Sequence, residues 1–438
     1  MAGELKIESV PISRRDSFNA RDKHTRDLKP FNSGDIKVLL LENVSPKAVD
    51  ILKRAGYQVD FYTKALDKET LIEKIKDVHA VGIRSKTKLT EEVLSHASKL
   101  LTIGCFCIGT NQVDLAYAAS RGICVFNSPF SNSRSVAELV IAEIILLARQ
   151  LGDRSREMHD GVWNKVSKNC YEIRGKTLGI VGYGHIGTQL SVLAESLGMH
   201  VIWYDILPVM PIGMSKAAET LDEVLAEADF VSCHVPETPE TKNMIGAREL
   251  AVMKKGSYLI NASRGTVVDI EALAAALKSG HLAGAAVDVY PSEPLANGPG
   301  FESALRNCPN TLLTPHIGGS TEEAQRMIGI EVATAITKFV DSGTSINAVN
   351  FAECDLRAIP STDRTTARIV NVHQNVPGVL RQINNILANY NVNKQISDSK
   401  GDVAYFMADV TVQNQEDITT IYEKIKEIQE NIITRVLF

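Results

Sequence analysis

The feature that most constrains the fold is the hexapeptide G-Y-G-H-I-G at residues 182–187. A short apolar run at residues 177–181 precedes it as a strand candidate, and residues 188–198 have the pattern of a helix. A second strand candidate ends at Asp205, 23 residues after Gly182. A strand, a glycine turn, a helix and a second strand that ends in an acid form the fingerprint of a dinucleotide-binding parallel sheet.

Each glycine of the hexapeptide has a separate task in such a fingerprint. Gly182 permits the sharp turn, Gly184 has no side chain that would block a pyrophosphate, and Gly187 lets helix and strand approach closely. The N-terminus of the helix offers unpaired N–H groups to the phosphates. Asp205 can accept hydrogen bonds from both ribose hydroxyls and would repel a 2′-phosphate, so the sequence favours NAD over NADP. A purely structural βαβ turn is the alternative, and Asp205 disfavours it.

Length and composition exclude several other classes of protein. A chain of 438 residues is too long for one ordinary core, so we expect two or three domains. A formal net charge of -5 gives no electrostatic reason to expect nucleic-acid binding. The apolar run nearest to a membrane span, residues 136–148, is too short and carries two glutamates. We therefore expect neither nucleic acid nor membrane as a partner.

The seven cysteines indicate a reducing compartment. They form no C-x-x-C pair and have no histidine nearby at zinc spacing, so we expect free thiols, no metal site and a cytoplasmic protein. Residues 1–18 lack the apolar core of a secretory signal. Acidic residues among the arginines argue against a mitochondrial presequence.

Strand and helix candidates alternate from Asp35 onward, which predicts parallel sheets covered by helices. A second series begins near Lys176, and the last segment has the β-α-β-β-α-β order of a ferredoxin-like unit. The fold class is therefore α/β, with two flavodoxin- or Rossmann-like domains and a C-terminal ferredoxin-like α+β domain. The expected divisions are a mobile tail (1–34), a discontinuous substrate-binding domain (35–131 and 320–345), a dinucleotide-binding domain (132–319), a linker (346–366) and the C-terminal domain (367–438).

The helix expected over residues 133–151 is apolar on nearly every side. Ser135 and Glu138 give its start the pattern of a capping box. We expect this helix to be buried all round, as a hinge or an oligomer interface between the two α/β units. Such an interface implies at least a homodimer.

Three loops that follow strand candidates of the second unit carry residues suited to hydroxy-acid oxidation. They present Arg264, then Asp288 and Glu293, then His316, at the sheet edge where open α/β folds bind ligands. The reaction needs a base for the alcohol proton, a cation for the substrate carboxylate and a group that tunes the base. Each residue alone also fits an ordinary surface loop, and their occurrence together favours a catalytic site.

These loops have the sequences N-A-S-R-G-T-V-V-D, P-S-E-P and T-P-H-I-G-G-S-T. Together with G-Y-G-H-I-G they resemble the D-isomer-specific 2-hydroxyacid dehydrogenases, over about residues 35–438. The resemblance is closest to members with a C-terminal ACT domain that oxidise 3-phospho-D-glycerate. It implies NAD-dependent formation of 3-phosphohydroxypyruvate, the first step of L-serine biosynthesis, with a side reduction of 2-oxoglutarate to 2-hydroxyglutarate. Two alternatives stay open: a related glyoxylate or hydroxypyruvate reductase, and a non-catalytic NAD-sensing corepressor.

The resemblance also implies a role for each matched residue. His316 would be the acid/base, Glu293 would hydrogen-bond and tune it, and Arg264 would hold the substrate carboxylate. Asp288 would face the nicotinamide side of the cofactor. The other positions expected to line NAD are His185, Ile186, Ala262, Ser263, Arg264, His316, Ile317, Gly318 and Gly319.

Substrate selection is expected in the first domain. Arg84, Ser85 and Lys86 follow a strand candidate there, and the two cations could bind a phosphate. A solvated surface loop is the plain alternative. By resemblance, Asn132 and Gln325 are further substrate contacts.

The C-terminal segment 372–380 resembles the turn of an ACT domain, a small amino-acid sensor. His373 and Asn375 lie at a strand end, and Pro377-Gly378 leads into a helix whose N-terminus can meet a carboxylate. With Asn393, the resemblance implies L-serine binding across a pair of ACT domains, feedback inhibition, and a homodimer or homotetramer. A dimerisation module that binds no effector is the alternative.

Overall fold

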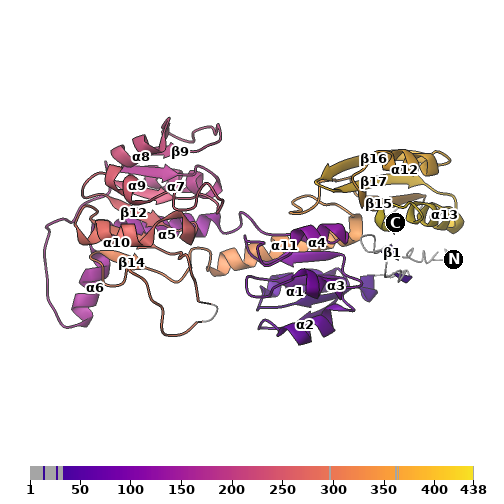
Figure 1. The fold of residues 1–438 in the computed structure, drawn as a ribbon, viewed down its shortest axis with the longest axis horizontal. Helices are drawn as coiled ribbons and strands as arrows, with labels where there is room; N and C mark the ends of the chain where they lie inside the picture. Colours follow the sequence, from indigo (N-terminus) through magenta and orange to yellow (C-terminus); the bar gives the residue numbers. More distant parts are fainter. Residues whose placement is uncertain are drawn as a thin grey trace. The chain divides into compact units, whose positions relative to one another are not determined.

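The computed structural model describes residues 33–294, 297–360, 363 and 365–437, together with the backbone of two short strands, β1 (Ser13–Arg14) and β2 (Arg26–Asp27). The tail expected at residues 1–34 lies almost wholly outside these described residues. Contacts divide the chain into two compact units, which we call the nucleotide unit (Phe130–Gln325) and the outer unit (Met1–Pro129 with Arg326–Phe438) (Figure 1).

The nucleotide unit is built on a parallel sheet in the order β10-β9-β8-β11-β12-β13-β14. The order reverses at β8, which is the topological switch point where doubly wound sheets bind their ligands. The strands are β8 (Thr177–Val181), β9 (His200–Tyr204), β10 (Lys216–Ala217), β11 (Phe230–Cys233), β12 (Tyr258–Asn261), β13 (Gly284–Val287) and β14 (Thr311–Leu313).

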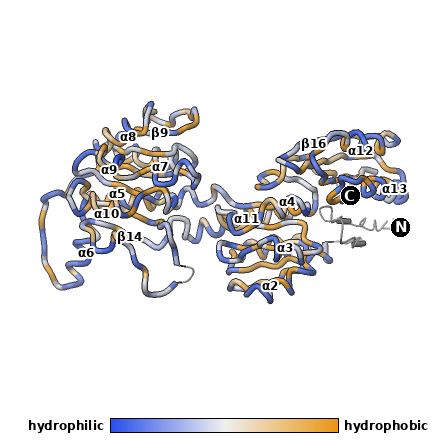
Figure 2. The backbone as a smooth tube through the Cα atoms, in the orientation of Figure 1, coloured by the Kyte–Doolittle hydropathy of each residue, from blue (hydrophilic) through white to orange (hydrophobic). Residues whose placement is uncertain are grey.

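The strands carry apolar side chains on both sides of the sheet, and helices cover both faces and bury these side chains. Ile260 of β12 packs toward α5 and α7, whereas its neighbour Leu259 packs toward α8, α9 and α10. Figure 2 shows the same pattern as apolar strands inside helices of mixed hydropathy. The helices are α5 (Ser133–Ala148), α6 (Leu151–His159), α7 (His185–Ser196), α8 (Leu221–Glu227), α9 (Ala247–Val252) and α10 (Ile270–Lys278), with a 3-10 turn at Gly265–Val267.

The helix α5 has one exposed side in the single chain, and the burial of that side at an oligomer interface stays a prediction. Val140, Ile144 and Leu147 are fully buried against α7 and the sheet. Ile145, on the opposite side, is 40% exposed. The apolar character of this side therefore has no partner within the described part of the nucleotide unit.

The outer unit contains a second parallel sheet, in the order β4-β3-β5-β6-β7. α1 and α11 cover one face, and α2, α3 and α4 cover the other. Its strands are β3 (Lys37–Leu40), β4 (Gln58–Phe61), β5 (Ala80–Ile83), β6 (Thr102–Cys105) and β7 (Cys124–Phe126). Its helices are α1 (Pro46–Arg54), α2 (Lys68–Ile75), α3 (Glu91–Ser95), α4 (Leu115–Ser120) and α11 (Glu322–Ser342), of which α11 belongs to this unit from Arg326 onward.

The C-terminal part of the outer unit is an antiparallel sheet in the order β16-β17-β15-β18, extended beyond β18 by the short β1 and β2. α12 and α13 pack on one face, which gives the ferredoxin-like arrangement predicted from the sequence. The elements are β15 (Thr366–Gln374), α12 (Val379–Leu387), β16 (Asn391–Lys400), β17 (Val403–Thr411), α13 (Gln415–Lys426) and β18 (Asn431–Leu437). The predicted α/β fold class is confirmed. Within the described residues, no helix has both the length and the apolar character needed to cross a membrane.

Candidate active site

The glycine turn between β8 and α7 has backbone geometry that other residues could not adopt. Gly182 lies at φ +94°, and a Cβ there would sit 2.5 Å from the carbonyl oxygen of His234. A Cβ on Gly187 would lie 2.3 Å from the carbonyl oxygen of Gly182. A Cβ on Gly184, by contrast, would meet nothing within 4 Å, so packing leaves open the space that a pyrophosphate would need.

The helix α7 begins at His185 rather than at Thr188, where the sequence had placed its start. Gly184 is its N-cap, so the N–H groups of the first turn belong to residues of the hexapeptide itself. The ring of His185 stacks on Phe130, with centroids 3.6 Å apart. The predicted cofactor residues His185 and Ile186 therefore lie in the first turn of a helix that opens toward the glycine turn.

Asp205 directly follows β9, and two backbone N–H groups fix its carboxylate. Oδ2 accepts from the Tyr183 N–H at 2.7 Å, and Oδ1 accepts from the Leu207 N–H at 2.9 Å. The carboxylate is thus attached to the glycine turn, as recognition of the cofactor ribose would require. Beyond it, Ile206 and Leu207 are 86% and 64% exposed, an apolar surface that our sequence analysis overlooked although the letters I-L-P-V-M after Asp205 signal it.

The loops that carry Arg264 and Glu293 approach each other closely at Gly265, which has no side chain. A Cβ on Gly265 would lie 2.0 Å from the backbone carbon of Tyr290, so only glycine permits this approach. The side chain of Asn261 shapes the first loop, because its Oδ1 accepts from the Ser263 hydroxyl at 2.8 Å and its Nδ2 donates to the Arg264 carbonyl at 3.0 Å. The fold therefore brings the predicted cation and the predicted tuning carboxylate to adjoining loops.

Glu293 and His316 form a direct pair. Nδ1 of His316 lies 2.8 Å from Oε2 and 3.0 Å from Oε1 of Glu293, while Oε1 also accepts from the Tyr290 N–H at 3.1 Å. An ionised carboxylate can only accept hydrogen bonds, so Nδ1 is the protonated nitrogen in this pair. Nε2 is then the nitrogen with a lone pair, which is the atom a general base must present.

The backbone of His316 is strained and held in place by Asp288. His316 lies at φ +54°, a left-handed conformation uncommon for residues with a Cβ. Its N–H donates to the Asp288 carbonyl at 2.8 Å. The buried Asp288 carboxylate accepts from the N–H groups of Ile317 and Gly318, each at 2.8 Å, and from the Thr314 hydroxyl at 2.6 Å. Such over-determination can maintain a strained catalytic residue.

Both oxygens of Asp288 are therefore engaged by the loop that carries His316. The sequence had predicted that this carboxylate would face the nicotinamide, and that contact stays a prediction. The geometry adds a task that sequence reasoning missed, because Asp288 fixes the backbone of two positions expected to line the cofactor.

Asn132 and Gln325 lie against the same loop. A Cβ on Gly319 would sit 2.5 Å from Nδ2 of Asn132, and Nε2 of Gln325 donates to the Gly319 carbonyl at 3.2 Å. The structure thus brings these two predicted substrate residues next to the loop that carries His316. Ala262 and Ser263 are buried at the end of β12, on the loop that leads to Arg264.

A buried carboxyl group in α5 was not predicted from the sequence. Glu143 of α5 is 2% exposed, and neither carboxyl oxygen has a hydrogen-bond partner among the described residues. Burial raises the pKa of Glu143 to about 8, and the Asp288 carboxylate contributes to the rise. The sequence signal was that Glu143 is one of two acids within the apolar run at residues 136–148.

The predicted substrate loop lies in the outer unit, directly after β5. Ser85 and Lys86 are exposed and Arg84 is half-buried. Among the described residues, no carboxylate pairs with the side chain of Arg84 or of Lys86. Within the part of the chain that the structure describes, both cations are therefore available to bind an anion. The described residues contain no cluster of His, Cys, Asp or Glu that could hold a metal ion.

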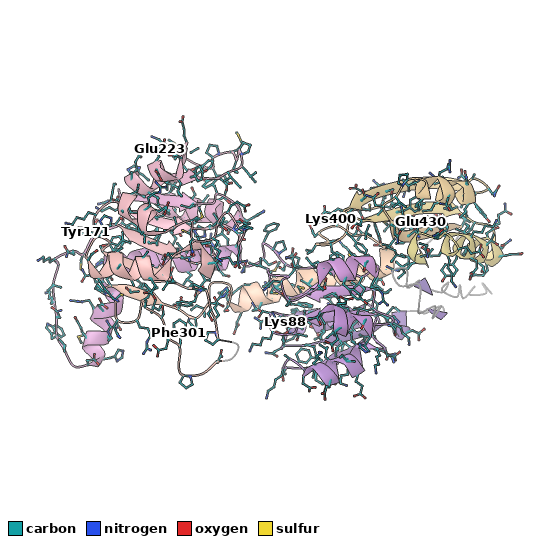
Figure 3. All side chains as sticks on the ribbon, in the orientation of Figure 1. Lys88, Tyr171, Glu223, Phe301, Lys400 and Glu430 are labelled. Carbon is teal, nitrogen blue, oxygen red and sulfur yellow. The ribbon has the colours of Figure 1, made fainter. Side chains whose placement is uncertain are left out.

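The three predicted effector residues do not converge within one chain. His373 pairs with Ala404 near one end of the ACT-like sheet, whereas Asn391, two residues before Asn393, pairs with Thr411 near the other end. At the first end, Lys400 pairs with Val403 and the Glu430 carbonyl accepts from the Gln374 N–H; Figure 3 labels Lys400 and Glu430. His373 is buried, which lowers its pKa to about 4, and its Nδ1 lies 2.8 Å from Oδ1 of Asn371. One chain alone cannot surround a small amino acid with these residues.

A parallel sheet with this glycine turn, together with a histidine–carboxylate pair beside an arginine loop, defines a nicotinamide-dependent dehydrogenase. Residues 141–318 match the family model described as the NAD binding domain of D-isomer specific 2-hydroxyacid dehydrogenase. The chain is 59% identical over 424 residues to D-3-phosphoglycerate dehydrogenase 1 of Saccharomyces cerevisiae, covering 95% of this chain and 90% of that protein. It is 51% identical over 407 residues to D-3-phosphoglycerate dehydrogenase of Escherichia coli K12, covering 92% and 98%.

Solved structures agree with this assignment. D-lactate dehydrogenase from Aquifex aeolicus, complexed with NAD and lactic acid, is similar with a TM-score of 0.62 at 29% identity, covering 72% of this chain and 99% of that one. The TT0316 protein from Thermus thermophilus gives a TM-score of 0.65 at 31% identity, covering 72% and 100%. The chain belongs to the D-3-phosphoglycerate dehydrogenases, within the D-isomer specific 2-hydroxyacid dehydrogenase family, and it is an NAD-dependent oxidoreductase.

Proposed function

We propose that this enzyme oxidises 3-phospho-D-glycerate to 3-phosphohydroxypyruvate with NAD, as the first step of L-serine biosynthesis. The observation that carries the proposal is the His316–Glu293 pair, held on a strained loop whose neighbour presents Arg264. The family supports the same substrate, since relatives at 50–59% identity carry the name D-3-phosphoglycerate dehydrogenase.

The residues of the nucleotide unit fit NAD. Gly184 leaves space for a pyrophosphate at the N-terminus of α7, and Asp205, bonded to the glycine turn, would accept the ribose hydroxyls. Ile206 and Leu207 offer an exposed apolar surface suited to the adenine. When bound, NAD accepts a hydride at its nicotinamide ring.

In the proposed reaction, Nε2 of His316 removes the proton of the C2 hydroxyl while the C2 hydrogen departs with its electron pair. Glu293 keeps the proton on Nδ1 and stabilises the imidazolium that forms. Arg264 binds the substrate carboxylate with two parallel N–H donors and polarises the C2 oxygen. The ketone then forms at C2 as the C–H and O–H bonds break together.

Substrate choice rests on the outer unit in this proposal. Arg84 and Lys86, which pair with no carboxylate among the described residues, would bind the phosphate, and Ser85 would donate a hydrogen bond. In the nucleotide unit, Asn132 and Gln325 beside Gly319 are proposed as further substrate contacts. We divide the chain accordingly into a substrate-binding domain (35–131 and 320–345), a nucleotide domain (132–319), a linker (346–366) and an ACT domain (367–438).

Regulation by L-serine is the second part of the proposal. Because His373 and Asn393 lie near opposite ends of the ACT sheet, two such sheets from two subunits would have to supply the contacts for one serine, including Asn375. A homo-oligomer is supported by the exposed apolar side chains of α6 and the loop after it, among them Met158 at 54% and Trp163 at 80%. A cytoplasmic location is supported by the seven cysteines, all of which are free thiols.

A panel of substrates tests the proposal. The full chain is mixed with NAD and either 3-phospho-D-glycerate, D-glycerate, D-lactate or D-2-hydroxyglutarate, and NADH is followed by absorbance, with and without L-serine. We expect the phosphorylated acid to be oxidised with the highest kcat/KM, and millimolar serine to slow that reaction. Preference for an acid without a phosphate would overturn the substrate proposal in favour of a related reductase. Absence of turnover with every acid, with NAD still bound, would favour a corepressor.

A further inference from the structure

Two consecutive residues after β3 have a backbone conformation that needs an explanation. Glu42 lies at φ +64° and Asn43 at φ +52°. Left-handed backbone at a glutamate is uncommon and persists where surrounding bonds enforce it. Glu42 is also only 7% exposed, an unusual position for a carboxylate without a cation.

The carboxylate of Glu42 is bound by the backbone of the substrate loop. Oε2 accepts from the Lys86 N–H at 2.9 Å, and Oε1 accepts from the Thr87 N–H at 2.8 Å. In the part of the chain that the structure describes, no cation pairs with it. Two backbone amides therefore compensate the buried charge, and breaking this arrangement would leave the carboxylate without partners.

The strained backbone of Glu42 is held by bonds to both neighbouring strands. The Leu41 N–H donates to the Gly82 carbonyl of β5 at 2.9 Å, and the Asn43 N–H donates to the Tyr62 carbonyl after β4 at 3.2 Å. From the other side of the loop, Nε2 of Gln112 donates to the Arg84 carbonyl at 2.7 Å. The segment 84–87 is thus fixed at both of its ends before any ligand arrives.

This arrangement determines which groups can meet a substrate anion. The amides of Lys86 and Thr87 are occupied by Glu42, so they are not available to a phosphate. We expect the anion to meet the side chains of Arg84, Ser85 and Lys86, whose directions follow from the backbone that Glu42 fixes. A loose loop would have to order these long side chains on binding, which weakens affinity.

We propose that Glu42 is a positioning residue for recognition of the anionic end of the substrate, acting through the backbone of residues 86 and 87. This inference rests on the proposed role of Arg84 and Lys86 in substrate binding. It assigns a specificity function to a buried acid that never touches the substrate itself.

The test compares Glu42→Gln with Glu73→Gln, which neutralises an exposed acid of α2 in the same unit. Glutamine at residue 42 keeps the size but loses one acceptor, so we expect kcat/KM for the preferred substrate to fall about 10–100-fold. The change should lie in KM, with kcat and NAD affinity close to wild type because NAD is expected in the nucleotide unit. Glu42→Asp, which keeps the charge but cannot span both amides, should raise KM in the same direction if the glutamine variant proves unstable.

A double-mutant cycle with Arg84→Ala separates positioning from a structural role. If Glu42 acts through the loop, Glu42→Gln should cost much less in kcat/KM once Arg84 is absent, so the two effects should not multiply. Fully multiplicative effects, or a KM for Glu42→Gln and Glu42→Asp equal to that of Glu73→Gln, would overturn the inference. The cycle uses whichever acid the wild type prefers, so a failure of the 3-phospho-D-glycerate proposal shows in the wild-type panel and not in the cycle.

Discussion

The buried carboxyl of Glu143 makes the stability of the nucleotide unit depend on pH. Burial, with a contribution from Asp288, raises its pKa from 4.5 to about 8. At pH values between 4.5 and about 8, Glu143 keeps its proton in the folded protein but has released it in the unfolded chain. The stabilisation is therefore complete below pH 4.5 and is lost as the pH rises to about 8.

The magnitude follows from linkage. Each pH unit in this interval lowers the free energy of unfolding by up to about 1.4 kcal/mol through this one group. Between pH 6 and pH 8 the loss is then about 2–3 kcal/mol. Glutamine at residue 143 keeps the shape and carries no charge at any pH, so Glu143→Gln should remove this slope. Relative to wild type, the variant should gain stability steadily as the pH rises.

The measurement is urea unfolding of wild type and Glu143→Gln at pH values from 6 to 9, followed by tryptophan fluorescence. Both tryptophans of the sequence, Trp163 and Trp203, lie in the nucleotide unit, so the signal reports the part that holds Glu143.

The matched control is Glu138→Gln, at an exposed position of the same helix. Glu138 pairs with the exposed Arg134, so its loss should cost little and should leave the pH dependence of wild type unchanged. An unfolding free-energy difference between Glu143→Gln and wild type that stays constant from pH 6 to pH 8 would refute the reasoning.

Further predictions concern the chemistry. His316→Asn should reduce kcat to the background of the assay while NAD still binds, as calorimetry can show, because the base is lost and the loop backbone stays bonded to Asp288. Glu293→Gln should lower kcat by about 10²–10⁴-fold with little change in NAD affinity, since the proton on Nδ1 loses its acceptor. Arg264→Lys should lower kcat/KM by about 10²–10³-fold, because an ammonium cannot bind a carboxylate through two parallel N–H groups. Asp205→Ser should raise kcat/KM with NADP relative to NAD, because the carboxylate that repels a 2′-phosphate is removed; an unchanged ratio in steady-state assays would contradict the assigned role.

Much of the catalytic region could be predicted from the sequence because its elements obey rules of spacing. The glycine hexapeptide and Asp205 are local in sequence and lie at the two ends of one βαβ unit. Arg264, Glu293 and His316 follow different strands, and parallel strands bring such loops to one edge of the sheet. The pairing of His316 with Glu293 came from the family resemblance, and the structure supplies its geometry.

What escaped prediction depends on contacts between segments that have no spacing rule. Three features arise only when loops and helices pack together in the fold. They are the close approach of Gly265 to Tyr290, the hydrogen bonds of Asp288 to residues 317 and 318, and the burial of Glu143. The start of α7 was misplaced because a glycine can serve as N-cap, and the sequence pattern gave the helix to the residues after Gly187.

At three strand ends, an acidic side chain accepts hydrogen bonds from backbone N–H groups. Asp205, Asp288 and Glu42 each lie just beyond a strand, and each carboxylate accepts hydrogen bonds from two backbone N–H groups. For Asp288 and Glu42 both groups lie in one loop, whereas Asp205 binds one N–H of the glycine turn and one of its own loop. An acid used in this way orders backbone and keeps its negative charge compensated by amide dipoles, so cationic side chains remain free for anionic ligands. Loops that are already ordered lose less conformational entropy when a ligand binds. Within each unit, these acids thus hold the backbone beyond their strands in place, and the amides that they bind compensate their negative charge.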